Sequence, residues 1–373
     1  MKIKLKTLTP IWTGGVDGKV DRIHETSIIG SLRWWYEVIV RGLGGHACDP
    51  SKHECTLDVE EYHKSNANDE RQRLHDAGLC DVCQVFGATG WRRRFRLKIE
   101  ETSISDASIT HPIRANRTYK RKVNNGEKEC TPTWYFADPT RVNQRPTPAN
   151  VPKEGEFVID IQNLAYDFPS KEVIAGLIQF IADWAALGAR PQIGFGVVDL
   201  VDGRINAKSS YKWVTAVAGN HQYNDLPSLR NMFFARIVPK NGSSFSEEEE
   251  KETFNLKYDL RRLFPNDQKL RHFIMGTVEE ERMAAKVSMS RPYEHKEKST
   301  IRVWGWIPQK AKQYQNGWDR EKVVNSIHNH LESNYCLEVW REMNSSRDTG
   351  TPNNNAVAFL RSLLGLEEGS NAV

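Results

Sequence analysis

The sequence has too few cysteines for a disulfide-stabilised fold, and it lacks an apolar run long enough to cross a membrane. Six cysteines are spread over 373 residues, far below the density of small secreted disulfide scaffolds. The longest apolar segment, 173–187, is interrupted by Gln179 and Asp183 and falls short of a membrane span. The first nine residues lack the apolar core of a signal peptide. We therefore expect a folded cytoplasmic protein with reduced thiols and no membrane partner.

Net charge gives little information about partners, whereas its distribution is informative. The chain carries a formal net charge of only +4. Residues 92–122, however, contain ten Lys or Arg and three acidic residues. A local basic segment of this kind favours an acidic partner such as RNA.

Hydrophobic periodicity predicts an α+β protein with two domains. In the first 205 residues, strand and helix patterns follow one another in the order β-α-β-β-α-β, over 2–11, 31–43, 92–101, 156–164, 170–187 and 195–201. This is the order of a ferredoxin-like (RRM-like) fold. The pattern recurs after a linker at 203–228, over 232–238, 246–264, 285–290, 300–307, 320–333 and 336–340. We therefore predict two tandem ferredoxin-like domains, residues 1–205 and 206–373, with an insertion at 46–90 and an irregular arm at 103–153 in the first.

Two glycine-containing segments are candidate phosphate sites. The loop from Gly188 to Gly196 contains Arg190 and Gly194, and its amide N–H groups are expected to be open to a phosphate. Near the N-terminus, Gly30 is expected to interrupt the chain and Ser31 to cap a helix whose first turn carries Arg33. The alternative is that both glycine segments are only turns.

Arginine and lysine side chains supply further candidates for RNA binding. Arg92, Arg93 and Arg94 follow a Gly-Trp turn and enter a strand together, and guanidinium groups bind phosphate in a bidentate manner. The arm adds Arg114, Arg117 and Lys120 around Tyr119, an aromatic residue that could stack on a base. The alternative is a solvated edge strand whose charge prevents aggregation.

The insertion contains a group of possible zinc ligands. These are His46, Cys48, His53, Cys55, Cys80 and Cys83. A structural zinc would stabilise a small lobe that lacks an apolar core, although the spacing fits no standard zinc finger and unliganded thiols are the alternative. The strongest candidates are His46, Cys48, Cys80 and Cys83, and we expect no other cofactor.

Catalysis is not expected from these residues. His24 and His111 could serve as a general base in metal-independent RNA cleavage, but an isolated histidine is more often a satisfied polar residue. Nothing in the sequence resembles the acidic cluster of a two-metal nuclease. We therefore assign no catalytic residue.

The segments quoted above resemble the repeat-associated mysterious proteins (RAMPs) of CRISPR systems. The resemblance involves Ile29–Arg33, Val85–Gly87 and the loop Gly188–Gly196, although the loop has fewer glycines in its first half than the family pattern. Within that family, Leu8–Gly15 together with Gly30–Trp35 and Phe86–Arg93 is similar to the first subunit type of the type III-B (Cmr) RNA-silencing complex. The resemblance covers about the first 200 residues.

The resemblance implies a non-catalytic subunit that binds CRISPR RNA, or its duplex with target RNA, near the guide 3′ end, alongside other Cmr subunits. By matching positions, it implies RNA contacts at Gly30, Ser31, Arg33, Arg92, Arg93, Gly194 and Gly196. Charge alone adds Arg94, Arg114, Arg117, Lys120 and Arg190. One alternative is a metal-independent endoribonuclease of the same superfamily that processes CRISPR RNA. Another is a scaffold whose basic arm docks an acidic protein.

Overall fold

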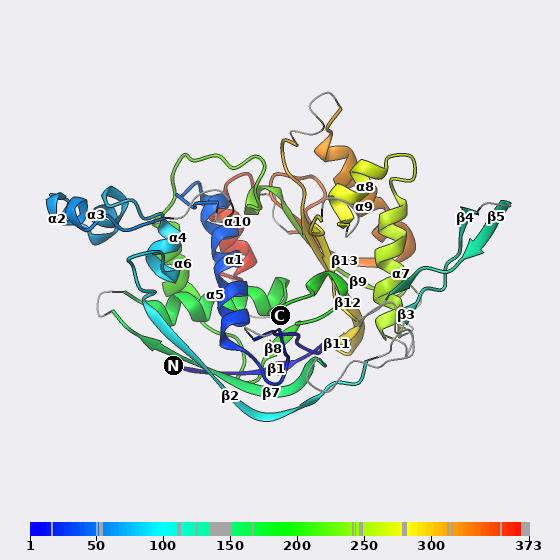
Figure 1. Ribbon diagram of the computed structural model, residues 1–373, viewed down its shortest axis with the longest axis horizontal. Coiled ribbons are helices and arrows are strands. Elements are labelled where there is room, and N and C mark those ends of the chain that lie inside the picture. The colour runs from blue at the N-terminus through cyan, green and yellow to red at the C-terminus, as the bar shows by residue number, and fades with distance from the viewer. Residues whose placement is uncertain are drawn as a thin grey trace.

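The computed structural model consists of two antiparallel sheets with helices packed against them (Figure 1). The residues that the structure describes are 1–366, except 16–17, 50, 52–54, 110–112, 124–125, 135–150, 166–167, 241, 243, 246–248, 278–281, 312–313, 315–316 and 351–352. The mixed helix and strand content with antiparallel sheets confirms the predicted α+β class. Among the described residues, none of the helices combines the length and the apolar character needed to span a bilayer.

The first lobe is built on a four-stranded sheet in the order β2-β7-β1-β8. Its strands are β1 (Lys2–Thr7), β2 (Phe95–Asp106), β7 (Lys153–Asn163) and β8 (Val198–Leu200). Along β1, Ile3 and Leu5 are buried between lysines that face outward, the alternation of a strand with one solvated face. The long helices α1 (Glu25–Leu43) and α5 (Ser170–Trp184) cover the sheet (Figure 1).

The second lobe repeats this strand order. Its sheet runs β10-β12-β9-β13, and the short strand β11 (Tyr293–His295) pairs with β12. The four main strands are β9 (Met232–Val238), β10 (Val287–Met289), β12 (Lys298–Trp306) and β13 (Cys336–Glu342). The helices are α7 (Glu249–Arg262), α8 (Gln268–Met275) and α9 (Arg320–Asn334). Numbered by chain order within each lobe, the main strands of both sheets lie in the order 2-3-1-4.

Two segments project from the first lobe on opposite sides (Figure 1). The insertion forms α2 (Val59–Lys64), α3 (Glu70–Asp76) and α4 (Asp81–Phe86). The arm forms two hairpin-like pairs, β3 (Ile113–Arg114) with β6 (Thr133–Trp134) and β4 (Tyr119–Val123) with β5 (Gly126–Cys130). In the insertion, α2 buries no residue and α3 buries only Leu74, whereas every residue of α4 is buried, so α2 and α3 have little apolar core of their own.

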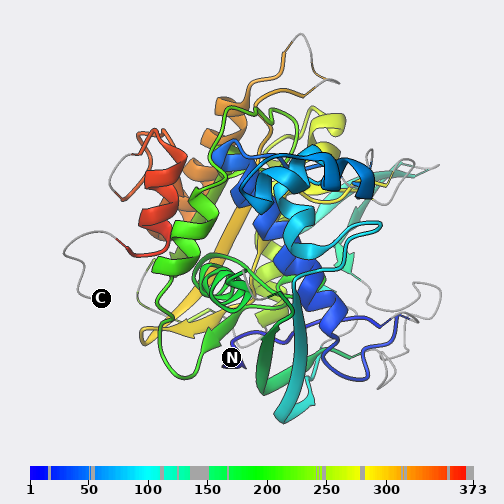
Figure 2. The ribbon, with the colours of Figure 1, turned by 90° about the vertical axis from the view of Figure 1, so that its left-hand side faces the viewer.

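The predicted linker at 203–228 contains a packed helix, which the sequence analysis missed. Helix α6 (Lys208–Thr215) buries Ser210 and Val214 against α5. A C-terminal helix, α10 (Ala356–Leu363), was also missed, and it packs beside α6 (Figure 2). The hydroxyl of Tyr211 in α6 donates a hydrogen bond to the carbonyl of Val357 in α10. The apolar core under α1 and α5 therefore includes side chains from the second lobe, such as Phe234 and Phe359.

Candidate nucleic-acid interface

Helix α1 begins six residues earlier than the sequence predicted. His24 is its N-cap residue, and Glu25 is its first residue. The prediction that Gly30 interrupts the chain and that Ser31 caps the helix is therefore wrong. Ile28, Leu32 and Trp35 are buried at helical spacing, and this packing outweighs the cost of about 1 kcal/mol for an interior glycine. Ser31 thus lies inside α1, and the N-terminus of this helix, at Glu25, does not place its free amides beside Ser31.

Ser31 instead connects α1 to the glycine-rich loop. Its hydroxyl accepts a hydrogen bond from the amide of Gly188 at 2.9 Å, and its oxygen lies 3.2 Å from the carbonyl oxygen of Ser27. Gly30, the preceding residue, is exposed and has no atom within 4 Å of the position a Cβ would occupy. The two predicted anion sites, far apart in the sequence, therefore lie in contact with each other.

The amides of the glycine-rich loop are mostly used within the protein. The N–H groups of Ala189, Gly194 and Gly196 donate to the carbonyls of Trp12, Pro191 and Pro10. The loop contains the short 3-10 helix η2 (Pro191–Ile193), and Gly194 and Gly196 are buried. The expectation that these amides are open to a phosphate is therefore wrong. Gly194 and Gly196 instead allow the loop backbone to pack closely against neighbouring backbone atoms.

Arg190 also has a partner within the protein. Its guanidinium carbon lies 3.8 Å from the ring centre of Trp12, and burial lowers its pKa. Its backbone adopts a left-handed conformation with φ 60°. Stacking on Trp12 holds the Arg190 side chain against the N-terminal segment of the chain.

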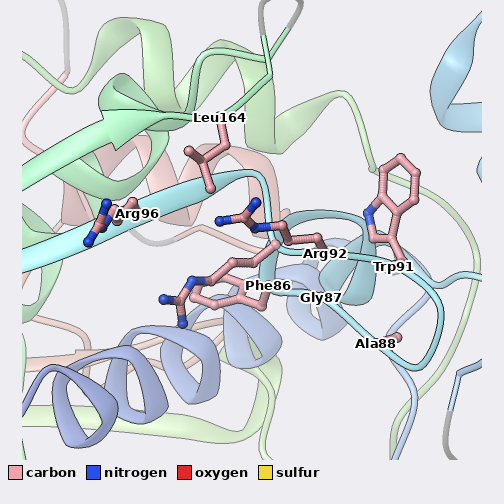
Figure 3. Close-up of a pocket in the computed structure, with 8 residues that line it drawn as sticks. Phe86, Gly87, Ala88, Trp91, Arg92, Arg96 and Leu164 are labelled. Carbon is pink, nitrogen blue, oxygen red and sulfur yellow. The ribbon is translucent and has the colours of Figure 1, made fainter.

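Three arginines surround a hollow at the start of β2, which we call the arginine pocket (Figure 3). Its volume is about 610 Å³, and its lining residues are Phe86, Gly87, Ala88, Trp91, Arg92, Arg93, Arg96 and Leu164. Arg92 and Arg96 are exposed, whereas Arg93 is half-buried and donates to the carbonyl of Phe95. Exposed guanidinium groups around one hollow are suited to bidentate phosphate binding.

Arg94 does not take part in this pocket. Its side chain is buried, pairs with Glu70 at 2.9 Å and donates to the carbonyl of Gln84. Its guanidinium also lies 5.0 Å from the ring centre of Trp91. The prediction that three consecutive arginines enter the strand as one cationic group is therefore wrong for Arg94, which lies in a bend just before β2 and turns inward onto these partners.

Arg33 approaches the arginine pocket from α1. Its Nη1 donates to the carbonyl of Gly87 at 3.2 Å and its Nε donates to Glu37 at 3.1 Å. Its Nη2 lies 3.3 Å from Sγ of Cys83. Arg33 therefore acts mainly as a bridge between α1 and the segment that leads into the pocket.

A second hollow lies between the two lobes, and we call it the interlobe groove. Its first part, about 750 Å³, includes Gly30, Ser31 and Gly188 of the first lobe, together with four tryptophans, Trp34, Trp35, Trp304 and Trp306. Its second part, about 800 Å³, contains the cations Lys257, Arg261, Arg262 and Arg271 and the aromatic residues Tyr119, Trp134, Phe254 and Tyr258. Gln192 and Met283–Ala285 line both parts, which makes the groove continuous.

Two lysines in the groove are buried. Burial lowers the pKa of Lys257 to about 7 and the pKa of Lys286 to about 8. The Lys257 ammonium donates to the carbonyl of Gln192 at 3.0 Å, and the Lys286 ammonium donates to the carbonyl of Phe273 at 2.9 Å. Neither lysine was predicted from the sequence, and nor were the cations of α7, although the spacing of Lys257 and Arg261 by four residues indicates a shared helical face.

The arm contacts α7 and so closes one side of the groove. Trp134 packs against Phe254 with ring centres 5.5 Å apart, and the amide of Asn116 donates to the side chain of Asn255. Arg117 makes two hydrogen bonds to Asp259, at 2.9 and 2.7 Å.

The other predicted residues of the arm lie in its two strand pairs, Arg114 in β3 and Lys120 in β4. Lys120 lies 3.4 Å from Glu127 in the β4–β5 pair, and Arg114 is exposed. The side chains of Arg121 and Lys122, and the residues His53, His111, Tyr135 and Phe136, lie outside the described part of the chain.

The insertion brings four cysteines together. The Sγ atoms of Cys48, Cys55, Cys80 and Cys83 all lie within 4.8 Å of one another, and all four residues are buried. His46 is not a member of this group, because its ring stacks against those of His75 and His221. The sequence prediction therefore located the cluster but included His46 in place of Cys55 among its strongest candidates.

His24, the candidate general base, lies at the start of α1. Its Nε2 is 2.8 Å from a carboxylate oxygen of Asp21, and its amide donates to the hydroxyl of Thr13. These contacts fix the residue that precedes the first turn of α1.

Comparison with solved structures finds chains of similar extent. One is Cmr1 from Pyrococcus furiosus, with a TM-score of 0.44 and 14% identity over 88% of this chain and 96% of that one. Another is a chain of the type III-B Cmr-beta complex bound to cognate target RNA and AMPPnP, with a TM-score of 0.44 and 12% identity over 89% of this chain and 98% of that one. A third, from Cmr-beta bound to cognate target RNA, has a TM-score of 0.35 and 12% identity over 87% and 99% of the two chains. No curated protein matches the sequence.

Comparison with protein families gives a match over the first lobe. The model of the RAMP superfamily matches residues 4–199, more than half of the 373 residues. The match covers β2, β7, α1, α5 and the glycine-rich loop in full, and most of β1 and β8. This chain belongs to the RAMP superfamily.

Proposed function

We propose that this chain is a non-catalytic, RNA-binding component of a type III-B CRISPR complex. The observation that carries the proposal is the convergence of three motif segments on α1. Ser31 is hydrogen-bonded to Gly188 of the glycine-rich loop. Arg33, two residues later on α1, is hydrogen-bonded to Gly87, which lines the arginine pocket. Helix α1 thus connects the arginine pocket with the interlobe groove. The type III-B assignment rests on the motifs Leu8–Gly15, Gly30–Trp35 and Phe86–Arg93.

The strand order of the two sheets supports two tandem ferredoxin-like domains as the framework. In each lobe the order 2-3-1-4 and the β-α-β-β-α-β succession are those of the split βαβ arrangement. We place the domain boundary near residue 205, between β8 and α6. The shared core under α5 would make the two domains a single packed unit.

The chemistry of the two hollows supports binding of a single strand of RNA. Exposed guanidinium groups of Arg92 and Arg96 would hold phosphates, which position the strand and carry no sequence information. Trp34 and Trp306, the half-buried tryptophans of the interlobe groove, would offer ring faces for unpaired bases. This division predicts strong salt dependence and weak sequence preference.

A salt series with single-stranded guide-like RNA tests the proposal. We expect Arg92→Ala/Arg96→Ala to weaken binding by about tenfold and to reduce the salt slope by about 1.4, because each phosphate contact to a single strand contributes about 0.7. The matched control is Lys208→Ala/Lys322→Ala, which removes two exposed lysines outside both hollows. If the arginine variant behaved like the lysine control, the arginine pocket would not bind RNA.

The non-catalytic role is tested separately. Repeat RNA incubated with the purified chain, without added divalent metal, should remain intact. Cleavage that was lost in His24→Ala would instead favour the processing endoribonuclease, with Asp21 orienting the histidine.

A further inference from the structure

We propose that Cys48, Cys55, Cys80 and Cys83 form a structural zinc site that holds the insertion against α1. The four sulfur atoms lie within 4.8 Å of one another, and those of Cys48 and Cys83 are 3.7 Å apart. Zinc binds thiolates at about 2.3 Å, so sulfur atoms at the corners of a tetrahedron around it lie about 3.8 Å apart. The 3.7 Å separation is much longer than a disulfide bond. The geometry is therefore that of a single ion with four thiolate ligands.

The local backbone is also arranged as at a zinc-thiolate site. Cys80 is the N-cap residue of α4, and its Sγ accepts a hydrogen bond from the amide of Cys83 at 3.4 Å. A Cys-x-x-Cys pair at a helix start places two sulfurs on the same side, which is a common spacing of zinc ligands. Cys48 and Cys55 approach from the preceding segment, so the ligands connect two ends of the insertion.

Charged groups on α1 complement the net negative charge that four thiolates and one zinc would carry. Arg33 donates to Sγ of Cys83 at 3.3 Å, and Arg41 donates to the carbonyl of Cys48 at 2.9 Å. Glu37 lies between them and accepts from both guanidinium groups, at 3.1 and 3.0 Å. This row of residues, spaced by four along one helical face, contacts both halves of the cysteine cluster. Such outer contacts orient metal ligands and tune their charge.

Two helices of the insertion have little apolar packing to hold them, whereas α4 is buried along its whole length. Helix α2 buries no residue, and α3 buries only one, so apolar packing contributes little to holding these helices. The energy of zinc binding adds directly to folding energy where no site is preformed in the unfolded chain. Because Gly87 directly follows α4, the zinc site would also fix one edge of the arginine pocket.

Metal analysis of the full-length chain purified under reducing conditions tests the site. We expect about one zinc per chain, and its loss in Cys80→Ser and Cys83→Ser. Matched controls are Cys130→Ser and Cys336→Ser, since these two cysteines lie outside the cluster and should leave the zinc content unchanged. His46→Ala should also retain zinc.

A cobalt experiment covers the possibility that the serine variants fail to fold. Wild-type protein depleted of zinc and loaded with Co²⁺ should show the visible absorption and thiolate charge-transfer bands of a tetrahedral tetrathiolate. A folded wild-type chain with neither zinc nor these bands would overturn the proposal. Full zinc content in Cys55→Ser, or its loss in His46→Ala, would overturn the four-thiolate assignment. All these readouts are independent of RNA binding.

Discussion

The two hollows differ in the solvent exposure of their cations. Two arginines of the arginine pocket are exposed, whereas Lys257 and Lys286 of the interlobe groove are buried. Arg92 and Arg96 are exposed, and an arginine remains charged at any pH at which the protein is folded. The two lysines have pKa values lowered by burial to about 7 and about 8. The charge of the pocket is therefore permanent, and the charge of the groove depends on pH and on what occupies it.

The two hollows also differ in how much of the fold they depend on. The arginine pocket is formed within one lobe, by a turn, the start of β2 and Leu164. The groove needs the glycine-rich loop, both lobes and the arm to be in place. A substitution in the glycine-rich loop should thus destabilise the folded chain and with it the groove. A substitution of an exposed arginine in the arginine pocket should instead change RNA affinity alone.

The largest expected effect is that of Gly196→Ala. A Cβ at this position would lie 1.9 Å from the carbonyl oxygen of Leu187, and the residue has φ +91°. Backbone strain and this contact together should lower the free energy of unfolding by about 3 kcal/mol or more. Denaturant titration of the purified chain measures the loss.

Gly203→Ala is the matched control. Gly203 also has a positive φ, +83°, but nothing lies within 4 Å of the position that a Cβ would occupy, so only the conformational cost of about 1–2 kcal/mol applies. Equal losses in the two variants would show that the glycine-rich loop can adjust, and the groove would then be less dependent on it than the contacts indicate.

A pH series distinguishes the two hollows in RNA binding. A bound phosphate favours the protonated form of Lys257 and Lys286, so RNA binding in the groove should be accompanied by proton uptake. RNA affinity should therefore fall about tenfold between pH 7 and pH 9. Lys257→Arg/Lys286→Arg should flatten this dependence, whereas Arg92→Ala/Arg96→Ala should keep it while binding more weakly. Dependence that survived in the lysine-to-arginine variant would mean that other groups titrate.

The same two lysines affect stability with the opposite sign. Their folded pKa values lie below the unfolded value of 10.5, so the unfolded chain binds more protons between about pH 7 and pH 10.5. Their contribution to the free energy of unfolding should therefore rise with pH over this window and be lost as pH falls through 8 and 7. Lys257→Met should reduce this slope in denaturant titrations at several pH values.

Periodic segments of the fold were predictable, because one buried face imposes a regular pattern. The range of β9 was predicted as residues 232–238, and the structure has Met232–Val238. Helix α6 was not predicted, since it buries only Ser210 and Val214. The start of α1 was misplaced because Gly30 and Ser31 look like a helix boundary, and only the contacts of Ile28 in the folded chain show that the helix continues.

The candidate site was predictable in its parts but not in its assembly. The run of arginines was visible, but Arg94 turns inward at a bend before β2, and its partners Glu70 and Gln84 belong to the insertion, so the sequence pattern of the strand does not show its direction. Glycine amides looked free because their acceptors, such as Pro10 and Trp12, are about 180 residues away in the sequence. The groove combines cations of α7 with aromatic residues of the arm, a tertiary arrangement that has no local signature.

The smallest expected effect is that of Arg117→Ala, and it tests whether charge in the arm belongs to RNA binding or to the fold. Arg117 is paired with Asp259 at the surface, and such pairs contribute about 0.5 kcal/mol. A double-mutant cycle with Asp259→Ala, measured by denaturant titration, should return a coupling energy of this size, with RNA affinity changed less than about threefold. A larger loss of RNA affinity in Arg117→Ala than in Arg92→Ala/Arg96→Ala would reverse the comparison. It would show that RNA can displace Asp259 from Arg117, and that the arm, rather than the arginine pocket, holds most of the phosphate contacts.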